Sequence, residues 1–230
     1  MLLDVHNLDV AYGLARVVSD ASIHVERGEM VFLVGRNGAG KTTLLRTIAG
    51  FLPAAAGDVA FDGASVSGTA PEVLARGGIR YVFQDKRVFT KLTVRENVQL
   101  AAFAQKVPLA AAIERVVAIH PRIARFLDAP AGGLSGGQRQ LLLIGRALIG
   151  DPKLLLIDEP TEGLAAGTID EVFEVLSNTK GKVAMLIVEQ NLPVVRELGD
   201  RVYAMKEGRI AVELTRPEEI RDAARLEAYL

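Results

Sequence analysis

Apolar residues alternate with polar ones, or form short unbroken runs, through the first part of the chain. Such runs occupy residues 2–12, 21–29 and 30–35, and charged residues or glycines separate them. Alternation with a period of two is typical of β-strands, because successive side chains point to opposite faces. We therefore expect β-structure here, followed by a hairpin-like pair around Asp62-Gly63 and a strand that leads to Gln84.

The spacing of apolar residues becomes helical between residues 86 and 150. Thr93 and Glu96 have the spacing of a capping box, and Pro108 suits the first turn of a second helix. A Pro- and Gly-rich connection over residues 128–138 precedes helical periodicity that runs to Gly150. These features predict a helical insert over roughly residues 86–150.

Strand-like runs return after the insert. Residues 153–158 and 182–189 are apolar runs of strand length, and the amphipathic segment 166–178 separates them. A β-α-β arrangement of this kind predicts a parallel sheet that is buried on both faces. The chain closes with a hairpin expected at Glu207-Gly208. We expect one α/β domain, with residues 1–85 and 151–230 as its core.

Composition excludes several classes of protein. The 27 basic residues nearly balance the 28 acidic ones, so the chain is unlike proteins that hold nucleic acid by neutralising phosphates, and we expect no nucleic-acid partner. Without cysteine there are no disulfides, thiolate metal sites or thiol nucleophiles. The N-terminus has no signal-peptide pattern, and no apolar stretch is long enough to span a bilayer. We expect a cytosolic protein that is able to dock on a membrane complex.

The segment GRNGAGKT, residues 35–42, matches the phosphate-binding pattern G-x-x-x-x-G-K-[ST] in full. It lies between an expected strand and an expected helix over residues 41–51, as the pattern requires. Its glycines let backbone N–H groups turn toward phosphate oxygens, Lys41 adds a positive charge, and the Thr42 hydroxyl can ligate Mg²⁺. The alternative is a glycine-rich turn that binds nothing.

Asp158 ends the apolar run of residues 153–158, and a second acid, Glu159, follows it. Ligands of open α/β sheets collect at the carboxyl ends of the strands. Adjacent acids cannot point the same way, so we expect Asp158 to face Mg²⁺ and Glu159 to face an attacking water. The alternative is a solvated acidic turn before Pro160.

The segment LSGGQ, residues 134–138, allows two interpretations. Ser135 and Gln138 have the spacing of a capping box. Capping does not explain Gly136 and Gly137, which cost helix stability by about 1 kcal/mol each relative to alanine. A first helical turn made of glycines exposes its backbone N–H groups, and these can bind an anion. Two phosphate-facing devices in one chain are useful if the second serves a neighbouring molecule, which predicts a two-fold dimer with ATP at its interface.

These motifs in this order resemble an ATP-binding cassette (ABC) ATPase over essentially the whole chain. The resemblance implies a P-loop NTPase fold, with a RecA-like core, an N-terminal antiparallel β subdomain and an inserted helical subdomain. It also implies that Tyr12 stacks on adenine and that Glu159 is the general base. Gln84 is implied to sense Mg²⁺ and the membrane partner. Ser135 and Gly137 are implied to contact the γ-phosphate that the opposite subunit binds. The residues alone leave Tyr12 as a strand-edge aromatic and Gln84 as a solvated strand end. The expected ATP-binding residues are Tyr12, Gly35, Asn37, Gly38, Ala39, Gly40, Lys41, Thr42, Thr43, Ser135, Gly136, Gly137 and Gln138; the metal ligands are Thr42, Gln84 and Asp158; the catalytic residues are Glu159, Gln190 and Gln84.

The chain departs from many cassettes at two positions. Ala165 stands where an aspartate is common in the loop that crosses the dimer interface. Gln190 stands where a histidine often contacts the γ-phosphate; a glutamine can still donate an N–H but cannot become charged. The alternative for Gln190 is a polar strand end before Pro193. Alternation turns its neighbours Glu189 and Asn191 elsewhere, and no role is assigned to them.

Together with the segments GRNGAGKTT, VFTKLTVRENV, LSGGQRQLLLIGRAL and VEQN, these departures resemble the second ATPase of branched-chain, or hydrophobic, amino-acid importers. The segment EPTEGL is also similar to the urea and short-amide importer branch. The implied partners are integral membrane permease subunits, a second ATPase subunit that is identical or paralogous, and indirectly an extracytoplasmic solute-binding protein. The implied location is the cytoplasmic face of the membrane. Alternatives are a nucleotide-gated cassette with little hydrolysis, a soluble cassette in translation or DNA repair, and an exporter.

Overall fold

A computed structural model describes residues 1–229, and these form two compact units. The first unit contains Met1–Tyr81, Lys153–Glu159 and the chain from Thr179 onward. The second contains Val82–Pro152 and Pro160–Asn178. Residues 160–178, which we expected within the core, therefore group with the helical insert.

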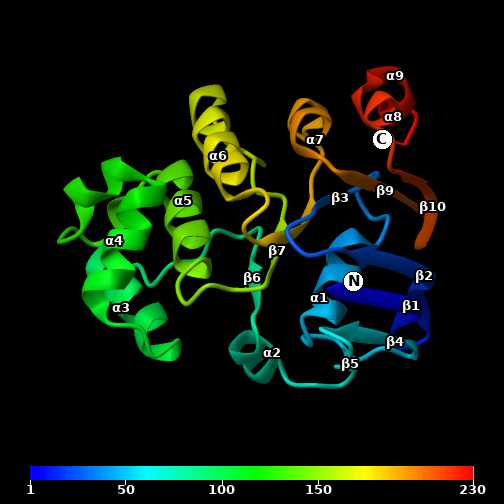
Figure 1. Cartoon of the computed structure of the whole chain (residues 1–230), viewed down its shortest axis with the longest axis horizontal. Helices are drawn as coiled ribbons and strands as arrows, with labels where there is room; N and C mark the ends of the chain where they lie inside the picture. The colour runs from blue at the N-terminus through cyan, green and yellow to red at the C-terminus, as the bar shows by residue number, and fades with distance from the viewer. Residues whose placement is uncertain (230) are drawn as a thin grey trace. The chain divides into compact units, whose positions relative to one another are not determined.

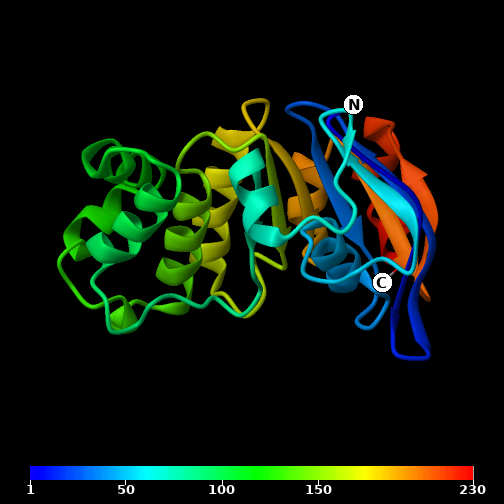
Figure 2. The same ribbon diagram turned by 90° about the horizontal axis from the view of Figure 1, so that it is seen from below.

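An antiparallel sheet in the first unit is formed by β1 (Leu3–Tyr12), β2 (Ala15–Val25), β4 (Ala56–Phe61) and β5 (Ala64–Ser65), in the order β2-β1-β4-β5 (Figure 1). The β4–β5 turn places Asp62 at φ 54° and Gly63 at φ 82°, the left-handed pair that a two-residue hairpin needs. The tip of the β1–β2 hairpin extends beyond the other strands (Figure 2). The predicted N-terminal β-structure and its hairpin are confirmed.

The second sheet of this unit has the order β10-β9-β3-β8-β7-β6. Strand β3 pairs in parallel with β8 and β9, β7 pairs in parallel with β8, and β9 turns back antiparallel into β10. Every residue of β3, β7 and β8 is buried, as the unbroken apolar runs predict. The strands are β3 (Met30–Val34), β6 (Ile79–Val82), β7 (Leu154–Asp158), β8 (Ala184–Val188), β9 (Arg201–Lys206) and β10 (Arg209–Leu214).

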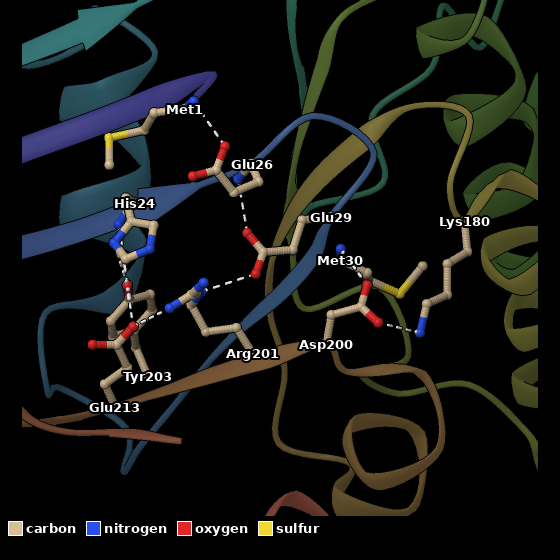
Figure 3. Close-up of polar contacts among 10 residues, drawn as sticks. All are labelled: Met1, His24, Glu26, Glu29, Met30, Lys180, Asp200, Arg201, Tyr203 and Glu213. Atoms are coloured by element: carbon tan, nitrogen blue, oxygen red, sulfur yellow. Dashed lines mark hydrogen bonds and ion pairs between the residues drawn. The ribbon is translucent and has the colours of Figure 1, made fainter. Parts of the chain in front are cut away.

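A chain of polar contacts joins β9 to neighbouring segments of the first unit (Figure 3). The Arg201 guanidinium donates to Glu29 at 2.9 Å and also to Glu213. The Tyr203 hydroxyl donates to Glu213 at 3.1 Å and accepts the backbone N–H of His24 at 3.2 Å. Because Arg201 is mostly buried, these charge-assisted bonds offset the cost of desolvating it. The network ties β2, β9 and β10 together.

The second unit is helical. Helices α3 (Val94–Ala104), α4 (Leu109–Ile119) and α5 (Gly136–Ala147) pack side by side, and buried residues that include Val98, Val116 and Leu142 form their common core (Figure 1). The Thr93–Glu96 capping box is present. The unit also contains η1 (Pro121–Phe126), η2 (Ala131–Gly133) and α6 (Ala166–Thr179). The helices expected between residues 86 and 150 are confirmed.

The first unit also has helices. Helix α1 (Lys41–Ile48) was predicted, whereas the patterns did not indicate α2 (Pro71–Gly77), α7 (Leu192–Leu198), α8 (Pro217–Arg221) and α9 (Ala223–Glu227). These four have at most seven residues, too few for a periodic apolar stripe to stand out. Among residues 1–229, no helix combines the length and the apolar character that a membrane crossing requires.

Candidate functional site

The loop between β3 and α1 has a backbone that only glycine allows at its first position. Gly35 has φ 144°, and a Cβ added there would lie 2.2 Å from the carbonyl oxygen of Met205. Gly40 caps α1 at φ 104°, another value that favours glycine. The first N–H groups of a helix have no partner within it, so they are available to an anion. The predicted strand–loop–helix context is confirmed.

Lys41, the first residue of α1, is buried with its ammonium against this loop. Its Nζ donates to the carbonyl oxygen of Gly35 at 2.6 Å and of Arg36 at 3.0 Å. Burial lowers the pKa of the Lys41 ammonium, and the charges of Glu159 and Asp158 partly offset this effect. The loop therefore carries a desolvated positive charge, which suits it to a polyphosphate.

Asp158, the last residue of β7, is buried and accepts hydrogen bonds from two half-buried hydroxyl groups. Its Oδ1 accepts the Thr42 hydroxyl at 3.0 Å, and its Oδ2 accepts the Tyr81 hydroxyl at 3.0 Å. Burial raises the pKa of Asp158, while these two hydrogen bonds counteract the rise. Carboxylate and hydroxyl oxygens are the ligands that Mg²⁺ prefers. Thr42 and Asp158 therefore supply oxygen atoms of the kind that could hold this ion beside the phosphate-binding loop.

Glu159 and Gln190 meet at the carboxyl ends of the neighbouring strands β7 and β8. The Gln190 Nε2 donates to Glu159 Oε1 at 2.8 Å and to Asn37 Oδ1 at 2.8 Å. Glu159 is buried, and its backbone lies in the left-handed region at φ 46°. Such a conformation costs about 1–3 kcal/mol outside glycine and is concentrated at functional sites. Glu159 thus combines an uncommon backbone conformation with a side-chain contact to Gln190.

Tyr12 ends β1 at the tip of the β1–β2 hairpin. Its side chain is 49% exposed, and Gly13 follows it with φ 60°. An exposed ring at a turn can present a face to a planar group such as a base. The stacking role of Tyr12 stays a prediction.

The LSGGQ segment starts α5 in the second unit and has the expected capping box. Ser135 Oγ accepts the Gln138 N–H at 3.2 Å, and Gln138 Oε1 accepts the Ser135 N–H at 2.9 Å. Gly137 has a packing reason as well, because a Cβ there would lie 2.1 Å from the Thr168 side chain. Apart from its chain neighbours and the backbone of its own helix, no heavy atom of residues 1–229 lies within 4 Å of a Cβ added to Gly136, so packing does not require this glycine. Of the two glycines, Gly136 is the one that capping and packing leave unexplained.

Gln84 also lies in the second unit, two residues after β6. Its Nε2 donates to Glu162 Oε2 at 2.6 Å, and the Lys86 ammonium donates to the carbonyl oxygen of Glu162. Ala165, where many cassettes have an aspartate, is exposed just before α6. The roles of Gln84 toward Mg²⁺ and a membrane partner stay predictions.

The first unit thus assembles most of the expected site. The motif residues Gly38, Ala39 and Thr43 lie on the loop and on α1, with Ala39 and Thr43 buried. Sequence reasoning missed Tyr81 and left Glu189 without a role. The available signal for Tyr81 was a hydroxyl in the expected strand before Gln84. The available signal for Glu189 was an acid that continues a buried apolar run. The ligand contacts of all these residues stay predictions.

A family model described as ABC transporter matches residues 18–162. The chain is 37% identical over 230 residues to the high-affinity branched-chain amino acid transport ATP-binding protein BraG of Pseudomonas aeruginosa, an alignment that covers 96% of this chain and 98% of that one. It is also similar to the ADP conformation of an ATP-binding cassette of an ABC transporter, with TM-score 0.85, 32% identity, and coverage of 99% and 98%. A dimeric post-hydrolysis cassette bound to ADP and Pi has TM-score 0.83 and 25% identity, with coverage of 93% and 98%.

These likenesses span nearly the whole chain and include both the sheet core and the helical insert. They confirm the expected fold class, a P-loop ABC ATPase fold. The phosphate-binding loop, the acids at the carboxyl end of β7 and the LSGGQ segment all fall within the residues that the family model matches. The chain therefore belongs to the ABC transporter family and is an ATP-binding ATPase subunit of such a transporter.

Proposed function

We propose that this subunit hydrolyses MgATP in a head-to-tail dimer and so powers the import of branched-chain or other hydrophobic amino acids. One contact carries the chemical part of the proposal: Gln190 Nε2 lies 2.8 Å from Glu159 Oε1. An acid and an amide donor meet where two parallel strands end, beside the phosphate-binding loop. The solute rests on the likeness to BraG, whose name assigns that protein to branched-chain amino acid transport.

Binding of ATP would use the loop and the first turn of α1. Backbone N–H groups of residues 38–43 and the Lys41 ammonium would hold the β- and γ-phosphates, and Tyr12 would stack on adenine. Thr42 and Asp158, with Gln84 as a further ligand, would hold Mg²⁺. This ion, when bound, neutralises charge on the β- and γ-phosphate oxygens.

In hydrolysis, Glu159 would act as the general base. A water oxygen bonds to the γ-phosphorus while the bond to the ADP oxygen breaks, and the water proton passes to the Glu159 carboxylate. Gln190 would donate its amide N–H to a γ-phosphate oxygen, where negative charge must be held during transfer. The Gln190 contact with Glu159 would keep both groups aligned before ATP arrives.

The LSGGQ segment would act on the opposite subunit. Ser135, Gly136, Gly137 and Gln138 of one protomer would face the γ-phosphate bound by the other, which gives two equivalent ATP sites under two-fold symmetry. Support comes from Gly136, because capping and packing leave it unexplained. The second subunit is either another copy or a paralogous ATPase.

The remaining partners follow from the family. Membrane permease subunits would dock on the ATPase at the cytoplasmic face of the membrane, and an extracytoplasmic binding protein would deliver the solute to them. Gln84 would report the state of the membrane partner to the ATP site. No nucleic-acid partner is proposed.

Replacing Tyr81 by Phe should weaken Mg²⁺ binding without removing a ligand. The change frees Asp158 Oδ2 from its 3.0 Å hydrogen bond, so the carboxylate can rotate away from the cation position. Loss of a hydrogen bond that orients a metal ligand typically weakens metal affinity about 10- to 100-fold. Titration of Mg²⁺ against binding of a fluorescent ATP analogue measures the effect. Tyr203→Phe is the matched control, since it removes another hydroxyl bound to a carboxylate in the same unit. An unchanged Mg²⁺ requirement in Tyr81→Phe would contradict the proposed role.

The identity of the transported solute can be tested with a reconstituted complex of the ATPase and its membrane permease subunits. We expect leucine, isoleucine or valine, presented with the cognate binding protein, to raise the ATPase rate of the complex in proteoliposomes, and we expect urea and acetamide to leave it unchanged. Stimulation by urea or acetamide alone would support the short-amide alternative instead. ATP binding without hydrolysis in the complete complex would favour the nucleotide-gated cassette.

A further inference from the structure

Glu189 is a buried acid directly after β8 that the proposed chemistry does not use. Its exposed fraction is 2%. Its Oε1 accepts two consecutive backbone N–H groups, from Gln190 at 2.7 Å and from Asn191 at 2.9 Å. Its own N–H donates to the carbonyl oxygen of Leu33 at 3.3 Å, next to the parallel pairing of β8 with β3. The residue is therefore anchored to the sheet by its backbone and to the following turn by its side chain.

The two N–H bonds determine the course of the chain after β8. Strand β8 ends at Val188 and α7 begins at Leu192, so only three residues make the turn. A carboxylate removed from water needs hydrogen-bond donors, and bonds from N–H groups to a charged oxygen are stronger than neutral ones. The Glu189 oxygen thus holds the backbone of Gln190 and Asn191 in one arrangement. If this side-chain oxygen were removed, the N–H groups of Gln190 and Asn191 would lose the acceptor that holds them. The backbone of the turn would then be free to change its conformation.

We propose that Glu189 is a positioning residue for Gln190. Its side-chain oxygen holds the Gln190 backbone so that the amide nitrogen reaches both Glu159 Oε1 and Asn37 Oδ1, each at 2.8 Å. The inference rests on the proposed function, in which Gln190 donates to the γ-phosphate. What matters is an acceptor oxygen at the correct distance from the backbone, and the negative charge serves only to strengthen its bonds.

Three substitutions separate the effect of side-chain length at position 189 from the effect of its charge. Glu189→Gln keeps an oxygen acceptor at the same length and loses the charge, whereas Glu189→Asp keeps the charge and draws the acceptor back by one methylene. Glu189→Ala loses both. We expect kcat for ATP to stay near the wild-type value in Glu189→Gln and to fall on the order of tenfold or more in Glu189→Asp and Glu189→Ala, since small misplacements of a catalytic group cost this much. Affinity for ATP, measured with a fluorescent analogue, should change little in all three.

A double-mutant cycle shows whether Glu189 acts through Gln190. Gln190→Ala should lower kcat, and in that background Glu189→Asp should have little further effect, because the group to be positioned is gone. The control is Glu29→Ala, which removes another carboxylate that accepts a backbone N–H in the same unit, from Glu26 at 2.7 Å (Figure 3). It should lower Tm and leave kcat and the Gln190 effect unchanged.

Each possible result decides the inference. Equal kcat in Glu189→Asp and the wild type, or fully additive effects with Gln190→Ala, would overturn the positioning role and leave the proposed function intact. A wild-type kcat in Gln190→Ala would overturn both the phosphate role of Gln190 and the positioning role of Glu189. If Glu189→Ala does not fold, the comparison of Glu189→Gln with Glu189→Asp still decides, because a requirement for charge predicts the reverse order.

Discussion

Glu159→Gln is expected to abolish steady-state ATP hydrolysis while ATP still binds. The substitution keeps the shape of the side chain and an oxygen that can accept the Gln190 amide, but it removes the group that takes the water proton. Loss of a general base typically lowers kcat by about 10²- to 10⁴-fold. Because bound ATP is no longer consumed, we expect ATP to increase the dimer fraction. The measurements are phosphate release and size-exclusion chromatography with light scattering.

The matched control is Glu197→Gln, the same chemical change at an exposed position of α7. This variant should hydrolyse ATP at the wild-type rate. If Glu159→Gln did so as well, the general-base role of Glu159 would be wrong, and another group would have to accept the proton.

Lys41→Ala should lose both ATP affinity and turnover. The Nζ lies 2.6 Å from the carbonyl oxygen of Gly35, within the phosphate-binding loop, and burial makes its charge more effective than that of a solvated lysine. Removing one preorganised contact to developing charge typically costs about 10²- to 10³-fold in kcat. We expect a loss of this size, with weaker binding of a fluorescent ATP analogue in addition.

Lys206→Ala controls for the loss of one positive charge near the loop. Lys206 is exposed on β9 and lines the same surface hollow as Arg36 and Asn37, but the proposed function gives it no phosphate contact. It should keep wild-type affinity and rate. An equal loss in both variants would indicate a general effect of surface charge, and wild-type behaviour of Lys41→Ala would contradict its role.

Local patterns predicted much of the fold. The capping boxes at Thr93 and Ser135 and the hairpins at Asp62 and Glu207 need only a few consecutive residues, so the sequence contains all the information for them. The phosphate-binding loop is similar, because its glycines, lysine and threonine are contiguous. Short helices such as α7 were missed because seven residues carry too little periodicity.

Roles that depend on distant partners could not be predicted in the same way. Tyr81 and Thr42 meet at Asp158 although 77 and 116 positions separate them from it, and only the pairing order of the strands brings them together. Gly137 looked like a functional glycine in the sequence, but the nearness of Thr168 supplies a packing reason. The segment 160–178 belongs to the same unit as the helical insert for the same reason, since its contacts with that unit are made through space and not along the chain.

The sequence by itself therefore determined the family of this protein, the phosphate-binding loop, the two acids at the carboxyl end of β7 and the position of Gln190 at a strand end. Only the tertiary structure decided what these groups touch. The parallel pairing of β7 with β8 places Glu159 next to Gln190, and the turn after β8 gives the buried Glu189 two backbone N–H groups to bind. The physical reason is that period and spacing specify local geometry, whereas the partner of a side chain depends on which strands lie side by side.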